Sequence, residues 1–456
     1  MIGIVTCIKH EADNNDSYFV IGEHGKPYQL KSNVIADCGD AVEYEKSITK
    51  VIADKKSHCA ENADAFASST IASFIEKDAY RTGNKEIDNI TEKMWNGLSA
   101  AARLLLRKLL YSAPIIIRFH NDADGSGGGC SLYLSVSDFC SKTKSQPNTV
   151  WLMHKKIAYG IYDAESDIAI ANNYRSAEKP LLVIIDFGTT TDSNMGIEKV
   201  KDKFDVIWLD HHPIQEGFGG LNVGYYINPW NFGGDSNYTA GLLSSIMCRT
   251  FSSLNTNEYA QASLIGDYSN YANLSNQEIS TILDFITSDA SSIYGNMKMN
   301  ITPQEMVAVI EDRKRRREVL NYAQSRMEEA IDNGKKYVKR YSSESVGLYV
   351  LNFEKIRSEE TKYPLPGRFA SKLLDAIYGS GDKNAVLIVH AGPYLSMRMS
   401  KEAGAKKDLL RIIDEIKREF AKSVDAGGGH ALAAGMKIAD QSEKHEIMKS
   451  LIKKFG

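Results

Sequence analysis

The stretch Pro114-Ile115-Ile116-Ile117-Arg118-Phe119-His120-Asn121-Asp122-Ala123-Asp124-Gly125 decides the fold, because a short apolar run leads directly into an imidazole and two carboxylates. Two later runs have the same form, since residues 181–185 precede Asp186 and residues 204–209 precede Asp210. Apolar runs with helical stretches between them are typical of a parallel sheet that is buried on both faces. The sequence therefore predicts an α/β domain built on a doubly wound parallel sheet.

Polar side chains at the ends of these three strands are expected to meet, since ligands of such sheets bind beyond the carboxyl ends of the strands. Alternate residues of an extended segment point the same way, which directs His120, Asp122 and Asp124 into one pocket. The glycines that follow, at positions 125 and 127–129, are expected to let the backbone turn and approach a ligand closely. Asp186 has an alternative interpretation as the N-cap of the next helix.

The tripeptide Asp210-His211-His212 adds a carboxylate and two imidazoles at the third strand end. So many ligands exceed what one ion needs and fit two divalent cations about 3.5–4 Å apart that share a carboxylate. Histidine and carboxylate ligands without thiolates favour Mn²⁺, with Mg²⁺ as the alternative, over structural zinc. A purely structural cluster would bury several like charges without a counter-ion, which is costly. The sequence thus predicts a two-metal site.

Taken together, these motifs resemble those of a known family. The segment His-x-Asp-x-Asp-Gly, the strand-terminal Asp186, the Asp-His-His tripeptide and the distant Gly427-Gly428-Gly429-His430 look like the DHH phosphoesterase superfamily. They are most similar to its RecJ-like exonucleases, especially the archaeal RecJ-like proteins. The resemblance covers roughly residues 113–440. It implies a DHH domain followed by a smaller α/β domain, the DHH-associated domain.

The resemblance also implies a role for each ligand of the metal site. His120 and Asp122 would bind one metal ion, and Asp124 would bind the other together with His211. Asp186 would bridge the two ions.

Three further residues take their roles from the same resemblance. Asp267, in the segment Leu264-Ile265-Gly266-Asp267-Tyr268, matches the family's aspartate in a later helix and would complete the metal ligands. His212 would contact the scissile phosphate. Asp210 would orient the two histidines from behind the ligands.

Substrate binding is assigned to the C-terminal part of the chain. Gly427, Gly428 and Gly429 match the family's glycine-rich substrate loop, in which backbone N–H groups form an anion-binding nest and His430 adds a donor. Ser396 and Arg398 resemble a Ser-x-Arg segment that holds a nucleic-acid phosphate, and arginine can do so bidentately.

The sequence divides into five parts. Residues 1–52 alternate in polarity between closely spaced turns and predict a small β-rich, OB-like module, with a β-hairpin cap as the alternative. Residues 53–112 predict a helical connector, 113–290 the DHH domain, 291–342 a linker helix and 343–456 the DHH-associated domain. The five consecutive cations at 313–317 favour a solvated helix surface over a nucleic-acid contact.

Composition narrows the class of protein. A chain of 456 residues is long enough for two or three domains. Its 55 basic and 58 acidic residues give a net charge of −3, which excludes a basic nucleic-acid coat protein but not a local basic groove. Six cysteines without a C-x-x-C pair, no signal peptide and no membrane-length apolar run predict a cytoplasmic protein with reduced thiols.

These inferences predict a two-metal exonuclease that degrades single-stranded DNA or RNA to nucleoside monophosphates, in replication or repair. One alternative is an oligoribonuclease or a phosphodiesterase of cyclic dinucleotides. The other is a non-catalytic replisome scaffold that binds the GINS complex, and GINS is a candidate partner for an active enzyme as well. Strand polarity, the preference for DNA or RNA, and the oligomeric state do not follow from these residues.

Overall fold

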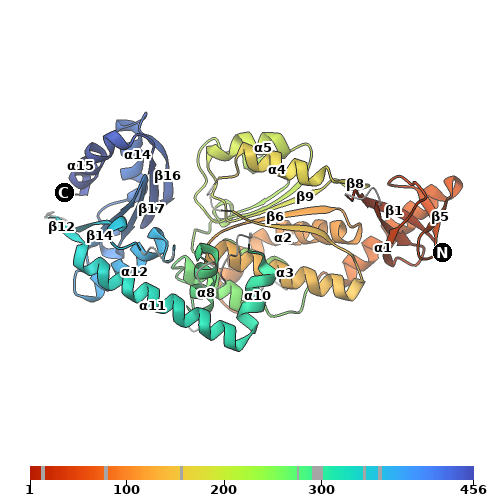
Figure 1. Cartoon of the computed structure of the whole chain (residues 1–456), viewed down its shortest axis with the longest axis horizontal. Coiled ribbons are helices and arrows are strands. Elements are labelled where there is room, and N and C mark those ends of the chain that lie inside the picture. Colours follow the sequence, from red (N-terminus) through yellow and green to blue (C-terminus); the bar gives the residue numbers. More distant parts are fainter. Residues whose placement is uncertain are drawn as a thin grey trace. The chain divides into compact units, whose positions relative to one another are not determined.

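A computed structural model describes residues 1–11, 16–76, 81–154, 158–274, 277–289, 301–341, 346–357 and 362–455. The chain divides into two compact units, one comprising Met1–Asp284 with Met299–Glu311 and the other Phe285–Lys298 with Asp312–Gly456. Each unit has its own sheets and core (Figure 1). The division of the sequence into five parts stays a prediction.

The first unit begins with an antiparallel β module. Its strands are β1 (Ile2–Lys9), β2 (Ser17–Gly22), β3 (Pro27–Lys31), β4 (Ala41–Tyr44) and β5 (Ile48–Val51). They pair in the order β3-β2-β1-β4-β5, and β8 (Tyr174–Ser176) adds to β1. Apolar side chains from all five strands enclose one core. The predicted small β-rich module is therefore present, and it is a sheet with its own core instead of a hairpin cap.

Two helices follow the module, α1 (Lys56–Phe74) and α2 (Lys85–Leu110). Helix α2 begins at Asn84, whose side chain accepts hydrogen bonds from two backbone N–H groups of the first turn. Its apolar stripe, which includes Leu98, Leu105 and Leu109, is fully buried. Apolar residues three or four apart thus form the helices that their spacing indicates.

The central sheet consists of β6 (Pro114–His120), β7 (Asn148–His154), β9 (Leu181–Ile185), β10 (Asp205–Leu209) and β11 (Tyr225–Ile227). All its strand pairs are parallel, and their order is β11-β10-β9-β6-β7. From β6, the next strand β7 is added on one side and β9, β10 and β11 are added on the other. The carboxyl ends of β6 and β9 are therefore the switch point where such folds bind ligands. The doubly wound parallel sheet predicted from the three apolar runs is confirmed.

Helices cover both faces of this sheet (Figure 1). Helices α4 (Ile161–Ala171) and α5 (Asn194–Val200) pack on one face, where their apolar residues share a core with β9 and β10. Helices α3 (Ala123–Thr143) and α6 (Ala240–Arg249) pack on the other, with α7 (Asn257–Gly266) against them both. Burial on both faces explains why the strands read as unbroken apolar runs.

The glycines after Asp124 differ from expectation, because they lie inside α3 and form no turn. A Cβ at Gly125 would lie 2.5 Å from the backbone N of His120, and one at Gly127 would lie 2.7 Å from the carbonyl O of Tyr259. One at Gly128 would lie 2.8 Å from Ser244 Oγ. These glycines therefore let α3 approach β6, α6 and α7 closely instead of bringing backbone to a ligand.

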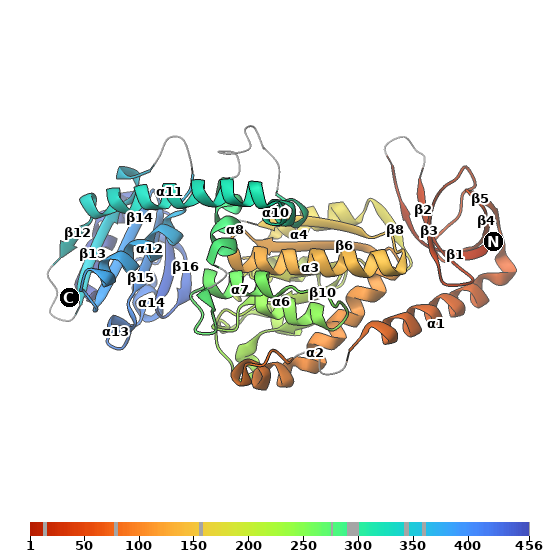
Figure 2. The ribbon, with the colours of Figure 1, turned by 90° about the horizontal axis from the view of Figure 1, so that it is seen from below.

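The remaining helices before the last sheet are α8 (Gln277–Asp289), α10 (Pro303–Glu311) and α11 (Arg313–Tyr337). The five cations at 313–317 occupy the beginning of α11, where all but Arg316 are exposed. Figure 2 shows α11 running along the second unit, where it contacts α12 (Pro366–Gly379) and β13 (Gly347–Asn352).

The second unit is built on a mixed sheet in the order β12-β13-β14-β15-β17-β16. Among the strands that the structure describes in this sheet, only β13 and β14 pair in parallel. One face packs against α11 and α12, and the other packs against α14 and α15. The elements not yet given are β12 (Lys339–Tyr341), β14 (Ala385–Ala391), β15 (Tyr394–Met399), α13 (Lys401–Gly404), α14 (Leu409–Glu419), β16 (Val424–His430), β17 (Ala433–Ile438) and α15 (Lys444–Phe455). The predicted second α/β domain is thus present.

The predicted glycine-rich loop is a strand. Gly427, Gly428 and Gly429 belong to β16, the edge strand of this sheet, and pair with Met436, Gly435 and Ala434 of β17. A Cβ at Gly429 would lie 2.4 Å from the carbonyl O of Ala433, so close pairing in the hairpin requires glycine there.

Among the described helices, none is long and apolar enough to span a membrane.

Candidate metal centre

The predicted metal ligands gather at the switch point of the parallel sheet. His120 is the last residue of β6, Asp186 directly follows β9, and Asp210 directly follows β10. Because these strands are parallel neighbours in one sheet, their ends place the three side chains at one edge. All ligands described below belong to the first unit.

The first ligand group consists of His120, Asp122 and Asp186. His120 Nδ1 lies 3.0 Å from Asp122 Oδ2 and 3.5 Å from Asp186 Oδ2. Asp122 is the N-cap of α3, and its other oxygen, Oδ1, accepts a hydrogen bond of 3.0 Å from Gly125 N. The cap fixes the Asp122 carboxylate with one oxygen turned toward His120.

The second ligand group consists of Asp124, His211 and Asp267. His211 Nε2 lies 3.2 Å from Asp124 Oδ2 and 3.2 Å from Asp267 Oδ2. Asp124 reaches this group from the first turn of α3. The prediction that alternate residues of an extended segment point the same way therefore holds for His120 and Asp122 but is wrong for Asp124, which is helical. Asp267 lies directly after α7 as its C-cap, one residue beyond the helix in which it was expected.

Asp186 lies between the two groups. Its Oδ1 is 3.5 Å from His211 Nε2 and 3.6 Å from His212 Nδ1, while its Oδ2 faces His120. Asp186 has a φ of +63°, a conformation that is costly for most residues but that aspartate tolerates better. Oδ1 is buried and has no hydrogen-bond partner among the residues that the structure describes. A buried carboxylate oxygen in this position is typical of a ligand and not of a helix cap.

The orientation of His211 is fixed by the backbone. Its Nδ1 lies 2.8 Å from the carbonyl O of Ser236, which can only accept, so Nδ1 donates this hydrogen bond. Nε2 is then the atom that faces the carboxylates of Asp124, Asp186 and Asp267. A histidine held in this way through one nitrogen presents the other as a metal ligand.

Asp210 is engaged entirely in hydrogen bonds. Its Oδ1 accepts from His211 N at 2.7 Å, from His212 N at 2.9 Å and from His212 Nδ1 at 2.8 Å. Its Oδ2 accepts from Phe187 N at 3.1 Å and Trp208 Nε1 at 3.2 Å. These contacts let Asp210 orient the His-His pair and the chain after Asp186, without itself joining a ligand group.

Asp124 is held by partners that the sequence analysis missed. Its two oxygens accept hydrogen bonds from Ala240 N at 3.0 Å and Gly241 N at 2.7 Å, the first residues of α6, whose helix dipole favours a negative charge there. Ser263 Oγ also donates to Asp124 Oδ1. Ser263 stands four residues before Asp267 along α7, and this helical spacing was the one sequence signal that could have indicated it.

The pKa values of the site follow from carboxylates packed around imidazoles. Burial lowers the pKa of His120 and His211, but the carboxylates of Asp122 and Asp124 outweigh it and raise both values well above the ordinary range. Burial, reinforced by the charge of Asp186, raises the pKa of Asp124 to about 8. Burial would raise the pKa of Asp210, but its bonds to His212 lower it well below the usual value.

This donor set fits divalent cations. Besides the two groups above, Asp186, His211 and His212 form a third, so Asp186 and His211 each belong to two of the three groups. Such a concentration of buried acceptors is costly unless protons or cations lie among them. The ligands suit oxygen- and nitrogen-binding divalent ions, and the site contains no thiolate among the described residues.

The predicted substrate-binding residues lie in the second unit. On β15, Ser396 pairs with Gly435 and Arg398 pairs with Ala433, and these residues of β17 in turn pair with Gly428 and His430 of β16. The ladder therefore places Ser396 and Arg398 in the same rows as the glycine strand. The side chain of His430 lies outside what the structure describes.

The guanidinium of Arg398 is oriented by its neighbours. Its Nε donates to Ser371 Oγ at 2.8 Å and its Nη1 donates to the carbonyl O of Met397 at 2.9 Å. A Cβ at Gly367 would lie 3.2 Å from Nη2 and 3.9 Å from Ser396 Oγ, so the beginning of α12 lies close to both side chains.

The sequence of this chain is similar to that of a curated archaeal protein, at low identity. No protein-family model matches the chain. An uncharacterized protein of Methanocaldococcus jannaschii is 23% identical over 403 residues, which are 77% of this chain and 53% of that protein. The chain thus spans about half the length of the curated relative that it matches.

The same fold occurs among solved structures. The DHH domain of a member of the s1p family of ribosomal proteins matches with a TM-score of 0.72 and 18% identity, over 87% of this chain and 98% of that one. RecJ from Thermus thermophilus in complex with Mn²⁺ gives a TM-score of 0.49 and 15% identity, over 80% of this chain and 58% of that one. The chain has the fold of a DHH-domain protein, and the resemblance seen in its motifs is confirmed at that level.

Proposed function

We propose that the protein is a two-metal phosphodiesterase that degrades single-stranded DNA or RNA from an end and releases nucleoside monophosphates. The observation that carries this proposal is the position of Asp186, whose Oδ2 faces His120 and whose Oδ1 faces His211 and His212. Oδ1 is buried and has no hydrogen-bond partner among the described residues. A shared carboxylate of this kind is what a pair of divalent ions requires.

In this proposal His120 and Asp122 would hold one ion, Asp124, His211 and Asp267 would hold the second, and Asp186 would be shared by both. Two such ions would supply charge stabilisation at the phosphate and a lowered pKa for an attacking water. Mn²⁺ is the favoured ion and Mg²⁺ the alternative. A scaffold without activity would not need these ligands, and all of them are present in this chain.

His212 is proposed to contact the scissile phosphate. Its Nδ1 donates to Asp210 Oδ1 at 2.8 Å, which fixes the orientation of the imidazole ring. Burial lowers the pKa of His212, but the charge of Asp210 more than offsets burial and raises it. A protonated His212 would offer a charged donor to the negative charge that develops on phosphorus oxygens.

The strand end is proposed to bind the second unit through Ser396, Arg398, Gly427, Gly428, Gly429 and His430. Arg398 supplies the charge, and its contacts to Ser371 and Met397 hold the planar guanidinium in one orientation. As the edge strand of its sheet, β16 presents backbone N–H groups on its open side.

The decisive experiment is digestion of 5′-labelled and 3′-labelled single strands of DNA and RNA with Mn²⁺, Mg²⁺ or EDTA. The proposal expects mononucleotides with Mn²⁺ and none with EDTA, and it is overturned if no strand is cut under any condition. Asp202→Asn, an exposed substitution, should leave digestion unchanged and serves as the control. Much faster turnover of a dinucleotide than of a 20-mer would favour the oligoribonuclease alternative.

The proposed setting is replication or repair in the cytoplasm, with GINS as a candidate partner. A pull-down with GINS subunits at moderate salt tests the partnership. Recovery of GINS by a variant that has lost its metal ligands would favour the scaffold function.

A further inference from the structure

A buried ion pair lies near the candidate metal centre without belonging to any of its three ligand groups. It joins Arg118 of β6, two residues before His120, to Asp167 of α4, and the two paired residues are 5% and 0% exposed. Arg118 Nε lies 3.0 Å and 2.9 Å from the two carboxylate oxygens, and Nη2 lies 2.7 Å from one of them. The hydroxyl of the buried Tyr159 donates to Asp167 Oδ2 at 2.8 Å. The buried carboxylate is thus compensated by protein groups.

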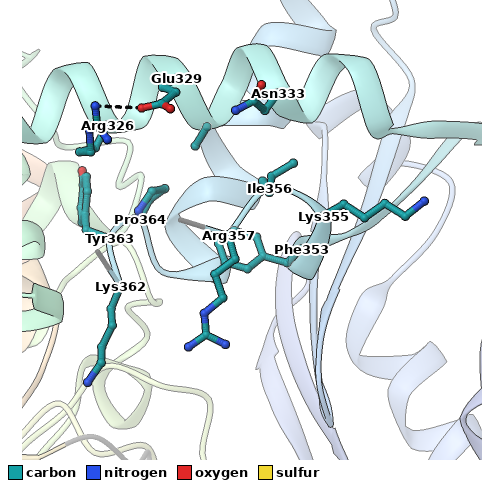
Figure 3. A pocket seen from close by; sticks show the side chains of 11 residues that line it. Arg326, Glu329, Asn333, Phe353, Lys355, Ile356, Arg357, Lys362, Tyr363 and Pro364 are labelled. Atoms are coloured by element: carbon teal, nitrogen blue, oxygen red, sulfur yellow. Dashed lines mark ion pairs between the residues drawn. The ribbon is translucent and has the colours of Figure 1, made fainter. Parts of the chain in front are cut away.

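An ion pair on the second unit provides a contrast. On α11, Arg326 Nη2 lies 2.9 Å from Glu329 Oε2, one turn along the same helix (Figure 3). Their side chains are 25% and 55% exposed, so water screens this pair and its contribution to stability is small. Arg118 and Asp167 instead lose their hydration on folding, a cost that their attraction and hydrogen bonds must offset. Since apolar side chains of similar volume often stabilise such a position equally well, stability alone does not account for the buried pair.

Further contacts of Arg118 lead to the beginning of α4 and to the end of β7. Its Nη2 donates to the carbonyl O of Asp163 at 3.3 Å, and its Nη1 lies 3.5 Å from Asp163 Oδ1. The other carboxylate oxygen of Asp163 accepts a hydrogen bond of 3.0 Å from Gly160 N, which fixes the first turn of α4. Asp163 Oδ1 also lies 3.5 Å from Nδ1 of His154, the last residue of β7. The carboxylate that Arg118 contacts therefore borders the ring of His154.

His154 in turn contacts the residue next to Asp186. Its ring stacks on the ring of Phe187, with 4.6 Å between the centroids and 10° between the planes. Phe187 directly follows Asp186, and its backbone N–H donates to Asp210 Oδ2 at 3.1 Å. Asp186 has a φ of +63°, and a residue in such a strained conformation persists only where the surrounding structure holds it. The stack of His154 on Phe187 is one of the contacts that hold this segment.

We propose that Arg118 and Asp167 are positioning residues for the metal centre. They act through the first turn of α4 and the ring of His154, which holds Phe187 and the strained backbone of Asp186. The buried charges are explained by this role, because a bidentate ion pair fixes the orientation of two elements more narrowly than apolar contacts do. The inference rests on the proposed function, since the metal binding of Asp186 is itself proposed.

Hydrogen–deuterium exchange of the full chain in EDTA tests the positioning role without a metal. The triple variant Arg118→Met, Asp167→Leu and Tyr159→Phe removes both charges and the hydroxyl and fills the site with apolar groups of similar size. Exchange of the Phe187 amide should be about tenfold faster than in the native chain, because backbone that is held less firmly opens more often. Thermal melts in EDTA should show that this variant folds with about native stability.

Mn²⁺ affinity, measured by calorimetry, is the second readout. The triple variant should bind Mn²⁺ about 10- to 100-fold more weakly, which is the loss expected when residues that orient metal ligands are removed. Arg118→Lys keeps the buried charge but not the planar fork, so it should show a smaller loss and a smaller gain in exchange. If the triple variant does not fold, Arg118→Lys supplies both readouts. His154→Ala should weaken Mn²⁺ binding less in the triple variant than in the native chain, because both changes interrupt the same contacts.

The matched control removes a buried ion pair at the opposite edge of the same sheet. Lys108, whose side chain is 1% exposed, lies 2.7 Å from Glu178 and 2.8 Å from Asp205, the first residue of β10. Lys108→Met with Glu178→Gln should leave both Phe187 exchange and Mn²⁺ affinity unchanged. The proposal is overturned if the folded variants of the Arg118 pair keep native exchange or native Mn²⁺ affinity, or if the control changes them equally. If the native chain binds no Mn²⁺, the proposed function fails, and the exchange of Phe187 alone decides whether the pair holds this segment.

Discussion

The candidate metal centre and the proposed strand-binding face of the second unit are built in opposite ways. At the metal centre, acceptor atoms come from the ends of parallel strands, and Asp124, Asp186 and His211 are almost completely buried. On the second sheet, Ser396 and Arg398 come from the middle of an antiparallel ladder and remain partly exposed.

The difference follows from what each site is proposed to hold. A small cation is bound tightly when its ligands are desolvated and rigid, so the carboxylates are buried and fixed by caps and backbone N–H groups. A phosphate on a long strand must approach from solvent, so its donors stay open. The two functions should therefore be separable by mutation.

The largest expected effect is that of Asp186→Asn, which removes the shared charge and keeps a residue that tolerates positive φ. Turnover should fall by about a thousandfold or more, because the ions contribute several kcal/mol and each 1.36 kcal/mol is a factor of ten. In EDTA the variant should still fold, because asparagine keeps the size of the side chain and tolerates the positive φ. Digestion of a labelled strand with Mn²⁺ measures the loss of turnover, and thermal melts in EDTA check the fold. Digestion at more than half the native rate would contradict the bridging role.

Arg398→Gln should leave the metal centre intact and weaken strand binding. Loss of a charge-assisted hydrogen bond is worth about 1.5–3 kcal/mol, which corresponds to about 10- to 100-fold in affinity. Fluorescence anisotropy with a labelled single strand measures this loss, and calorimetry with Mn²⁺ should show native metal binding. Arg418→Gln, with an exposed arginine on α14, is the control. A parallel loss of metal affinity would show that the two regions are not separable.

A smaller effect is expected at His154, the last residue of β7 and the strand neighbour of His120. Its ring stacks on Phe187 at 4.6 Å and 10°, and Phe187 follows the strained Asp186. His154→Ala should lower Mn²⁺ affinity about tenfold, as for other residues that support metal ligands. His154→Phe can keep the stack and should restore most of it. Calorimetry with Mn²⁺ compares the two, and equal losses would contradict a positioning role for the ring.

The smallest effect concerns pH. Burial beside Asp186 raises the pKa of Asp124 to about 8, so the folded metal-free protein binds a proton there that the unfolded chain releases near pH 4. This stabilisation is fully present below pH 4 and is lost as the pH rises through 8. Thermal melts in EDTA should show stability falling over that range for the native chain and less so for Asp124→Asn. Saturating Mn²⁺, which replaces the proton, should flatten the native profile.

Much of the fold and of the metal centre could be predicted from the sequence. Three apolar runs ending in His120, Asp186 and Asp210 indicate both a parallel sheet and the edge where its ligands meet. The six predicted ligands all fall in the ligand groups of the structure, although their roles as metal ligands stay a proposal. The prediction succeeds to this extent because strand burial and ligand type are local properties of the chain.

Other features depended on contacts between distant segments. The glycines of α3 read as a turn because their close neighbours, Tyr259 and Ser244, lie more than a hundred residues away. Gly427 to Gly429 read as a loop because only pairing with β17 makes them a strand. The support of Asp124 by α6 and Ser263 had no clear signal in its own segment.

The sequence by itself determined the parallel sheet, its ligand-bearing strand ends and the kind of ion they suit. Periodicity and side-chain chemistry are properties of short segments, so they can be read without the tertiary structure. The tertiary structure decided which carboxylate joins which histidine and which glycines are packing positions. These features depend on contacts between segments far apart in the chain, and such contacts form only when the helices and strands pack together.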